Sequence, residues 1–182
     1  QQVAWGGTGE ICVRSVHWMI EYHNRPDATR ESMFIDSSGL QWLRTGDIGR
    51  TDEDGYLYII DRKKDMILSA GHNIYPADIE ALMVEHPLVA EVGVIGVPDA
   101  TWGETPVAIV VPRAGSAAAD LAATLLEWTN QRVGKRQRLR EVRIVDTLPR
   151  NPNGKILKRE LRRTYVAAGD VVARATGPRE NQ

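Results

Sequence analysis

Cysteine is almost absent from the sequence: Cys12 is the single one among 182 residues, so no internal disulfide bond can form. Disulfides are typical of secreted proteins, and their exclusion favours a reducing compartment, so we expect a cytoplasmic protein. No apolar run approaches the roughly 20 residues that a membrane span needs, and we expect none. The first residues also lack the charged start and apolar stretch of a secretory signal.

Charge of one sign is not in excess either. Lys and Arg number 23 against 24 Asp and Glu, a formal net charge of −1. Nucleic-acid-binding proteins usually show a basic excess, so we expect no nucleic-acid partner, although Arg132 to Arg143 is locally basic. The four histidines have no metal-ligand spacing with Cys12, so we expect no metal site built from these residues. With 42% apolar residues, the composition is typical of a globular protein.

Short strand and helix patterns predict an α+β fold in two unequal parts. Residues 1–61 are mostly β-forming and read as the end of a larger domain that begins upstream. Residues 66–166 predict a small domain with a three-stranded sheet and packed helices, and 167–182 a loose tail. The strands of this domain are expected at 89–97, 106–112 and 141–146, and its helices from Tyr75 to His86, at 116–133 and at 156–165.

The two parts are joined by a charged run, Asp61-Arg62-Lys63-Lys64-Asp65. Such runs are most often solvated turns. This one lies where the pattern changes, at 62–65, which is where a hinge would be expected. Lys64 is the candidate hinge residue.

Three segments offer side chains suited to binding a nucleotide. Asp47, which follows Gly46, can accept two hydrogen bonds from a ribose diol, and Arg62 offers a rigid fork of donors. Lys155 ends the loop Asn151-Pro152-Asn153-Gly154 and can present a point charge to a phosphate. It is not part of a P-loop, because Pro149 and Ile156 occupy the positions that need Gly and Ser or Thr. Taken alone, each segment is more often structural.

Together the motifs resemble a known family. Thr-Gly-Asp at 45–47, Asp-Arg-x-Lys-Asp at 61–65, Gly-x-Asn-x-x-Pro at 71–76 and Asn-Pro-x-Gly-Lys at 151–155 follow one another in this order. They are similar to those of the superfamily of acyl- and aryl-CoA synthetases, peptide-synthetase adenylation domains and firefly luciferase. The resemblance implies two half-reactions: a carboxylate and ATP form an acyl-adenylate and pyrophosphate, and a thiol then displaces AMP.

The resemblance also implies roles for individual residues. Asp47 and Arg62 match the positions that hold the ribose hydroxyls, and Lys64 matches the hinge. Lys155 matches the adenylation lysine, whose ammonium would neutralise charge growing on the α-phosphate. Because one small domain would have to offer Lys155 and then the 69–73 loop to the same centre, a two-position hinge is required.

Further matches lie on the side of the coenzyme. Gly71 corresponds to the place where the backbone leaves room for the pantetheine arm, since a glycine has no side chain. Trp102 corresponds to an aromatic residue that lines the coenzyme side in some relatives, and a packing role fits it equally well. Ala70 replaces a second Gly, and residues 134–138 depart from the Tyr-Lys-x-Pro type of sequence, which leaves the grip on the coenzyme nucleotide open.

The resemblance predicts the C-terminal part of an AMP-forming acyl-CoA ligase acting on a carboxylic, presumed fatty, acid. It implies ATP or AMP, coenzyme A and Mg²⁺ as cofactors, and the missing N-terminal domain of the same enzyme as partner. The fragment alone would be inactive, and acetylation of Lys155 would remove its charge. Two alternatives are a domain that loads a carrier-protein thiol and a stand-alone, non-enzymatic binding module. The acyl pocket would lie upstream of residue 1, so the acid is not readable here.

Overall fold

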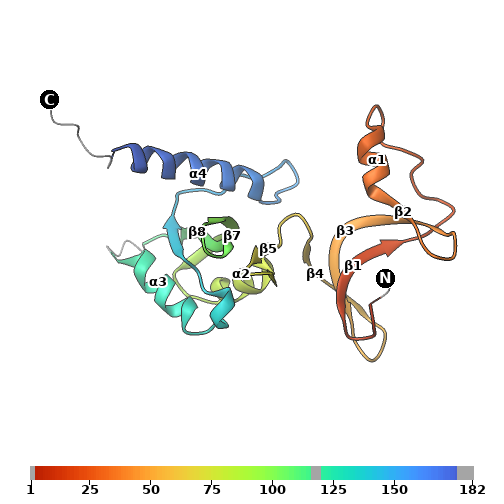
Figure 1. Ribbon diagram of the computed structural model, residues 1–182. Coiled ribbons are helices and arrows are strands. Elements are labelled where there is room, and N and C mark those ends of the chain that lie inside the picture. The colour runs from red at the N-terminus through yellow and green to blue at the C-terminus, as the bar shows by residue number, and fades with distance from the viewer. Residues whose placement is uncertain (1–2, 116–119, 176–182) are drawn as a thin grey trace. The chain divides into compact units, whose positions relative to one another are not determined.

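The computed structural model describes residues 3–115 and 120–175 (Figure 1). The chain separates into two compact units, Gln1–Lys64 and Asp65–Gln182. Each unit is described below by itself. Within the described ranges, no helix combines the length and the apolar character needed to cross a membrane.

The first unit is a small antiparallel sheet built around one long strand, β3 (Gln41–Thr51). β1 (Thr8–Val13), β2 (Met33–Ile35) and β4 (Leu57–Arg62) all pair with β3, and α1 (Pro26–Ser32) precedes β2. The turn between β3 and β4 is organised by Asp52, whose carboxylate accepts the Tyr56 N–H and the Tyr58 hydroxyl. The pairing of β3 with β4 sets Asp47 opposite Arg62.

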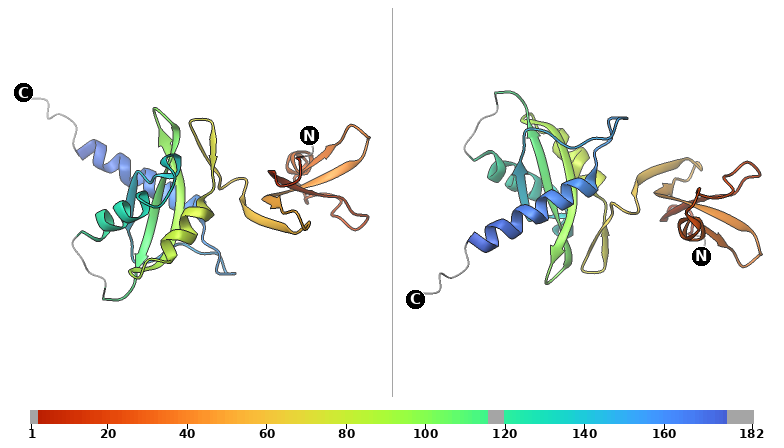
Figure 2. Two further views of the ribbon diagram at one scale, coloured as in Figure 1. Left: turned by 90° about the horizontal axis from the view of Figure 1, so that it is seen from below. Right: turned by 90° about the horizontal axis from the view of Figure 1, so that it is seen from above.

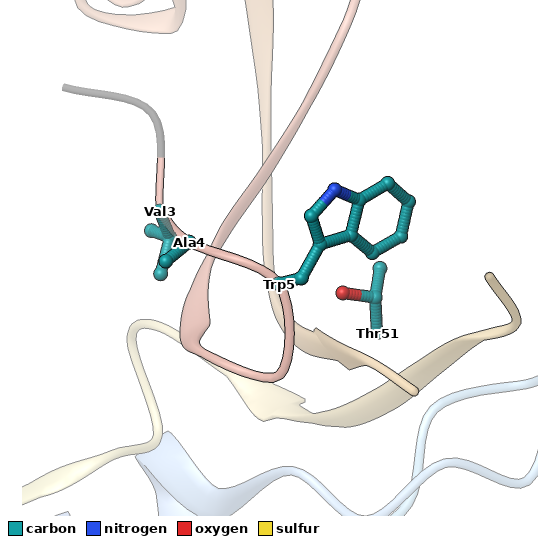
Figure 3. A pocket seen from close by; sticks show the side chains of 4 residues that line it. All are labelled: Val3, Ala4, Trp5 and Thr51. Carbon is teal, nitrogen blue, oxygen red and sulfur yellow. The ribbon is translucent and has the colours of Figure 1, made fainter. Parts of the chain in front are cut away.

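This unit covers little of its own apolar surface. Among its described residues, Ile48 is the only large apolar side chain that is buried. Ile35, Leu57 and Ile59 are more than half exposed. The indole of Trp5 is 78% exposed and stands beside Thr51 at a shallow depression (Figure 3). A sheet of this kind normally packs against another layer to bury its apolar face.

The second unit has a five-stranded sheet. Its order is β6-β5-β8-β7, and β9 pairs in parallel with β8. The elements follow the chain as β5 (Ile67–Ser69), β6 (His72–Ile74), α2 (Pro76–Val84), β7 (Val89–Asp99), β8 (Gly103–Pro112), α3 (Leu121–Asn130), the 3₁₀ helix η1 (Lys135–Gln137), β9 (Glu141–Ile144) and α4 (Lys158–Ala175).

Both faces of this sheet are covered, which explains the nearly continuous apolar runs of β7 and β8. Helices α2 and α3 lie on one face and α4 lies on the other (Figure 1). Ile79 and Met83, four residues apart, are the buried side chains that α2 presents to the first face. On the second face Leu161 of α4 comes so close to β7 that a Cβ on Gly93 would lie 2.9 Å from it.

The predicted α+β class is confirmed, but the predicted sheet of three strands is wrong. The sequence 69–73, expected to be a loop, belongs to the β5–β6 hairpin, which adds two strands. The three residues of β6 carry too little periodicity to be recognised before their partner strand is known.

Two predicted helix boundaries also differ from the structure. Helix α4 continues through Ala175, although a loose tail was expected from residue 167; alanines at 167, 168, 173 and 175 favour helix. Helix α3 begins at Leu121, whereas the sequence predicted a start at 116; residues 116–119 lie outside the described ranges.

The core of the second unit should be sensitive to lost volume. Leu125 of α3 is fully buried in the cluster beneath the sheet. Replacing it with alanine is expected to lower the free energy of unfolding by about 2–5 kcal/mol, because apolar burial is lost and a cavity remains. Chemical denaturation of the chain measures this change. Val84→Ala, at a half-exposed site on α2, should change it by less than about 1 kcal/mol, and an equal loss in both variants would contradict the assignment of this core.

Candidate functional site

An acidic and a basic side chain face each other across β3 and β4. Arg62 Nε lies 2.8 Å from Asp47 Oδ1, and the side chains are 39% and 27% exposed. The contact is an ion pair without hydrogen-bond geometry at Nε, which makes no hydrogen bond within the described residues. The preceding Gly46 has a φ of +74°, and its carbonyl accepts the Lys63 N–H. The pair therefore presents an acceptor and a donor fork together at a partly open surface.

Sequence reasoning missed Glu10, which is opposite Ile48, the residue after Asp47, in the pairing of β1 with β3. Its Oε2 accepts hydrogen bonds from Lys63 Nζ at 2.8 Å and from Arg44 Nη1 at 3.0 Å. Burial raises the pKa of the Glu10 carboxyl, but the hydrogen bonds and charges of Lys63 and Arg44 outweigh burial and hold this pKa below its ordinary value. No local pattern could relate residue 10 to residue 63, because the contact depends on the pairing of β1 and β4 with β3.

Lys64 is the last residue of the first unit. It is exposed and lies in the turn between β4 and β5. Asp65, the first residue of the second unit, is held from α4: Arg162 Nη1 lies 3.7 Å from its carboxylate. Lys64 is thus an exposed residue at the boundary between the units, and the next residue is attached to the second unit.

Asn151 organises the loop that carries Lys155. Its Oδ1 accepts the N–H groups of Asn153 at 3.1 Å and of Lys155 at 2.8 Å. Its carbonyl accepts the Gly154 N–H, and Gly154 has a φ of +80°, which suits glycine. The backbone of Lys155 is therefore fixed while its side chain is exposed.

The base of this loop is attached to the sheet. Arg150 forms an ion pair with Glu91 at the start of β7, with Nη2 and Oε2 2.6 Å apart. Ile156 packs partly buried against the cluster beneath α4, and the Leu157 N–H donates to the Pro149 carbonyl at 2.8 Å. The loop that carries Lys155 is thus attached to the rest of the unit on both sides.

Gly71 lies in the two-residue turn of the β5–β6 hairpin. Ala70 and Gly71 have φ of +47° and +77°, as a tight hairpin turn requires. The Ala70 N–H donates to the Trp102 carbonyl at 2.7 Å, and Ser69 pairs with Gly103. No atom lies within 4 Å of a Cβ placed on Gly71. The turn is consequently held from behind and open in front.

The left-handed backbone of Ala70 predicts a stabilising substitution. Ala70→Gly should raise the free energy of unfolding by about 1 kcal/mol, since the Cβ at φ +47° is strained by roughly that amount. Thermal denaturation of the chain tests this. Ala81→Gly, at an exposed position inside α2, should have the opposite sign because glycine weakens a helix. Destabilisation by both substitutions would contradict the strain at Ala70.

Trp102 and a cationic segment border the hairpin turn. Trp102 is 55% exposed, and its backbone N–H donates to Asp99 Oδ1 at 3.0 Å. That hydrogen bond and the one from the Thr101 N–H hold the pKa of Asp99 below its ordinary value. Arg136 of η1 approaches His72 of β6, with Nη1 and Nδ1 3.3 Å apart. An aromatic face and a guanidinium thus flank an open turn.

The Lys155 loop and the Gly71 turn lie at opposite ends of the second unit. The loop is attached to Glu91 at the start of β7, whereas the Gly71 turn pairs with Gly103, which is opposite Asp99 at the end of β7. Glu91 and Asp99 are eight positions apart in β7, so the strand rises about 26 Å between them. Both views of Figure 2 show the loop before α4, in blue, far from the hairpin tip, in yellow.

The chain is similar to known proteins over most of its length. Residues 78–155 match the AMP-binding enzyme C-terminal domain. Over 161 residues the chain is 45% identical to the long-chain-fatty-acid–CoA ligase FadD13 of Mycobacterium tuberculosis, covering 88% of this chain and 30% of that one. The chain thus carries an AMP-binding enzyme C-terminal domain and is similar to an acyl-CoA ligase over most of its own length. Lys155 is the last residue of its matched C-terminal domain, and Gly71 lies just before the domain begins.

Another relative is named for an acid different from that of FadD13. The chain is 43% identical over 154 residues to a 2-succinylbenzoate–CoA ligase of Bacillus cytotoxicus, covering 85% of this chain and 30% of that one. Among solved structures, ATP-bound MatB from Rhodopseudomonas palustris has a TM-score of 0.79 at 35% identity, over 90% of this chain and 31% of that one. The chain therefore spans about a third of the length of these relatives.

Proposed function

We propose that the chain is the C-terminal third of an ATP-dependent acyl-CoA ligase that activates a carboxylic acid, of the fatty-acid class, and transfers it to coenzyme A. The observation that carries this proposal is the placement of an exposed lysine and an open glycine turn at opposite ends of one small unit. One end serves adenylation and the other serves thiol transfer. The similarity to FadD13 supports the fatty-acid class.

In the first half-reaction the acid carboxylate attacks the α-phosphorus of ATP, and pyrophosphate leaves. Lys155 lowers the barrier because its ammonium offsets negative charge that grows between the attacking oxygen and the phosphate. Asp47 accepts hydrogen bonds from the ribose hydroxyls, and Arg62 donates to them. Mg²⁺ would accompany the ATP phosphates, as the solved structure of a Bacillus subtilis relative in complex with ATP and magnesium ion suggests.

In the second half-reaction the coenzyme A thiol attacks the acyl carbonyl, and AMP leaves with the bonding electrons. The turn at Gly71 leaves room for the pantetheine arm, with Trp102 beside it. Because about 26 Å of strand β7 lies between the attachment points of the Lys155 loop and of the Gly71 turn, one reaction centre can meet only one of them at a time. The second unit therefore rotates between the steps, with Lys64 as the hinge.

We propose that the isolated chain lacks ligase activity and that the rest of the large domain covers the exposed face of the first unit. Exposure of Lys155 also makes its ammonium accessible to acetylation, which would remove the charge needed for adenylation. Transfer to a carrier-protein thiol is the alternative to coenzyme A.

Pyrophosphate release tests the proposed function. The full-length enzyme is incubated with ATP, a panel of fatty, aromatic and dicarboxylic acids, and either coenzyme A or a carrier protein. Turnover with fatty acids and coenzyme A supports the proposal, and turnover only with the carrier protein contradicts it. The isolated 182-residue chain should be silent in the same assay, and activity of this chain alone would refute our assignment of an upstream nucleotide site.

A further inference from the structure

A shielded ion pair joins α2 to the first residue of α4. Lys158 Nζ lies 2.7 Å from Glu80 Oε1, and the two side chains are only 12% and 21% exposed. The same Glu80 oxygen accepts the backbone N–H of Val94 in β7, also at 2.7 Å. One carboxylate therefore connects the helix on one face of the sheet, the strand β7 and the helix on the other face.

Lys158 occupies a position where a charged ammonium group is unfavourable unless it is paired. A lysine at the first residue of a helix faces the positive end of the helix dipole, which is unfavourable for its charge. Shielding its ammonium from water adds a further cost unless it is paired. Glu80 offsets both costs at this site, and α2 holds Glu80 rigidly because the neighbouring Ile79 is fully buried.

The pair acts on the chain immediately next to Lys155. Only Ile156 and Leu157 separate Lys155 from Lys158, so a shift of the first turn of α4 moves the loop. Glu91 fixes the other side of that loop through Arg150. Without Glu80, the start of α4 would be attached by the apolar contacts of Ile156 and Leu161 and by the longer ion pair of Arg162 with Asp65.

We propose that Glu80 and Lys158 are a positioning pair that holds the Lys155 loop in register on the sheet. Adenylation should depend on the pair, whereas thiol transfer should not, because the Gly71 turn is held by Trp102 and Gly103 at the far end of β7. The effect on adenylation rests on the proposed function, but the effect on the loop itself does not.

The loop is tested first in the 182-residue chain by amide hydrogen exchange. In the unmodified chain the Lys155 amide donates a hydrogen bond to Asn151. In Lys158→Met this amide should exchange about tenfold faster, because the loop opens locally more often. Lys158→Arg keeps the charge and should leave exchange nearly unchanged. Arg44→Gln removes a different ion pair, with Glu10 in the first unit, and is the control. Unchanged exchange in Lys158→Met would overturn the proposal.

The two half-reactions are then measured separately in the full-length enzyme. Lys158→Met and Glu80→Gln should each slow adenylate formation by about 10–100-fold, since small displacements of a catalytic group have effects of this size. The double variant should be no slower than the Lys158→Met variant, because the two changes remove one interaction. Conversion of supplied acyl-adenylate to thioester should stay within about twofold of the unmodified enzyme, and Lys158→Arg should preserve both steps.

Two further results would separate the positioning role from a purely stabilising role and from the proposed function of Lys155. Equal loss of both half-reactions would show that the pair only stabilises the fold, and the positioning role would be wrong. If Lys158→Met opens the loop but neither it nor Lys155→Ala slows adenylation, the positioning of the loop stands and the proposed function of Lys155 fails.

Discussion

Lys155→Ala in the full-length enzyme is expected to slow acyl-adenylate formation by about 10²–10³-fold. The substitution removes one preorganised charge from the place where negative charge grows, and losses of this size follow removal of a single electrostatic group. The fold should not change, because the Lys155 side chain is exposed and the loop is held through its backbone and Asn151. Pyrophosphate release in the absence of coenzyme A measures the effect.

The control for this substitution is Arg159→Ala. Arg159 is also exposed, lies four residues further on in α4 and carries the same charge. If loss of net positive charge were sufficient, both variants would be slow. Adenylation by Lys155→Ala at the rate of the unmodified enzyme would show that Lys155 is only a surface lysine.

The loop that presents Lys155 is the part of the candidate site that the sequence describes best. Asn, Pro and Gly in succession have few backbone alternatives, and the observed bonds to Asn151 are all local. The open turn at Gly71 is a different case. Ala70 adopts a left-handed conformation that alanine normally avoids, so the residues of the turn predict a loop, and only the pairing of Ser69 with His72 reveals the hairpin.

Contacts between distant residues account for what sequence reasoning missed. Glu10 meets Lys63 only because β1 and β4 both pair with β3, and Glu80 meets Lys158 only after α2 and α4 have packed around β7. Neither carboxylate stands in a motif. Local patterns thus predict the side chains that would touch a ligand, whereas the groups that hold them in place depend on the register of the fold.

Gly71→Leu should slow thioester formation and spare adenylate formation, the reverse of the effect expected of Lys155→Ala. Thioester formation from supplied acyl-adenylate is expected to fall by about 10²-fold, because a branched side chain would fill the space proposed for the pantetheine arm and displace the thiol. Adenylate formation should stay within about twofold, since the Gly71 turn and the Lys155 loop are attached at opposite ends of β7. Single-turnover assays of each half-reaction measure the two rates.

Backbone strain must be separated from blockage of the arm in this experiment. Gly71 has a φ of +77°, so any side chain there strains the backbone, although no protein atom lies within 4 Å of the new Cβ. Gly115 has a φ of +84° and equally open surroundings, so Gly115→Leu carries the same strain at a position without a proposed ligand. Equal loss of thioester formation in the two variants would mean that strain is the cause. A loss confined to Gly71→Leu, increasing from alanine to leucine at that position, would mean that the coenzyme needs the space in front of the turn.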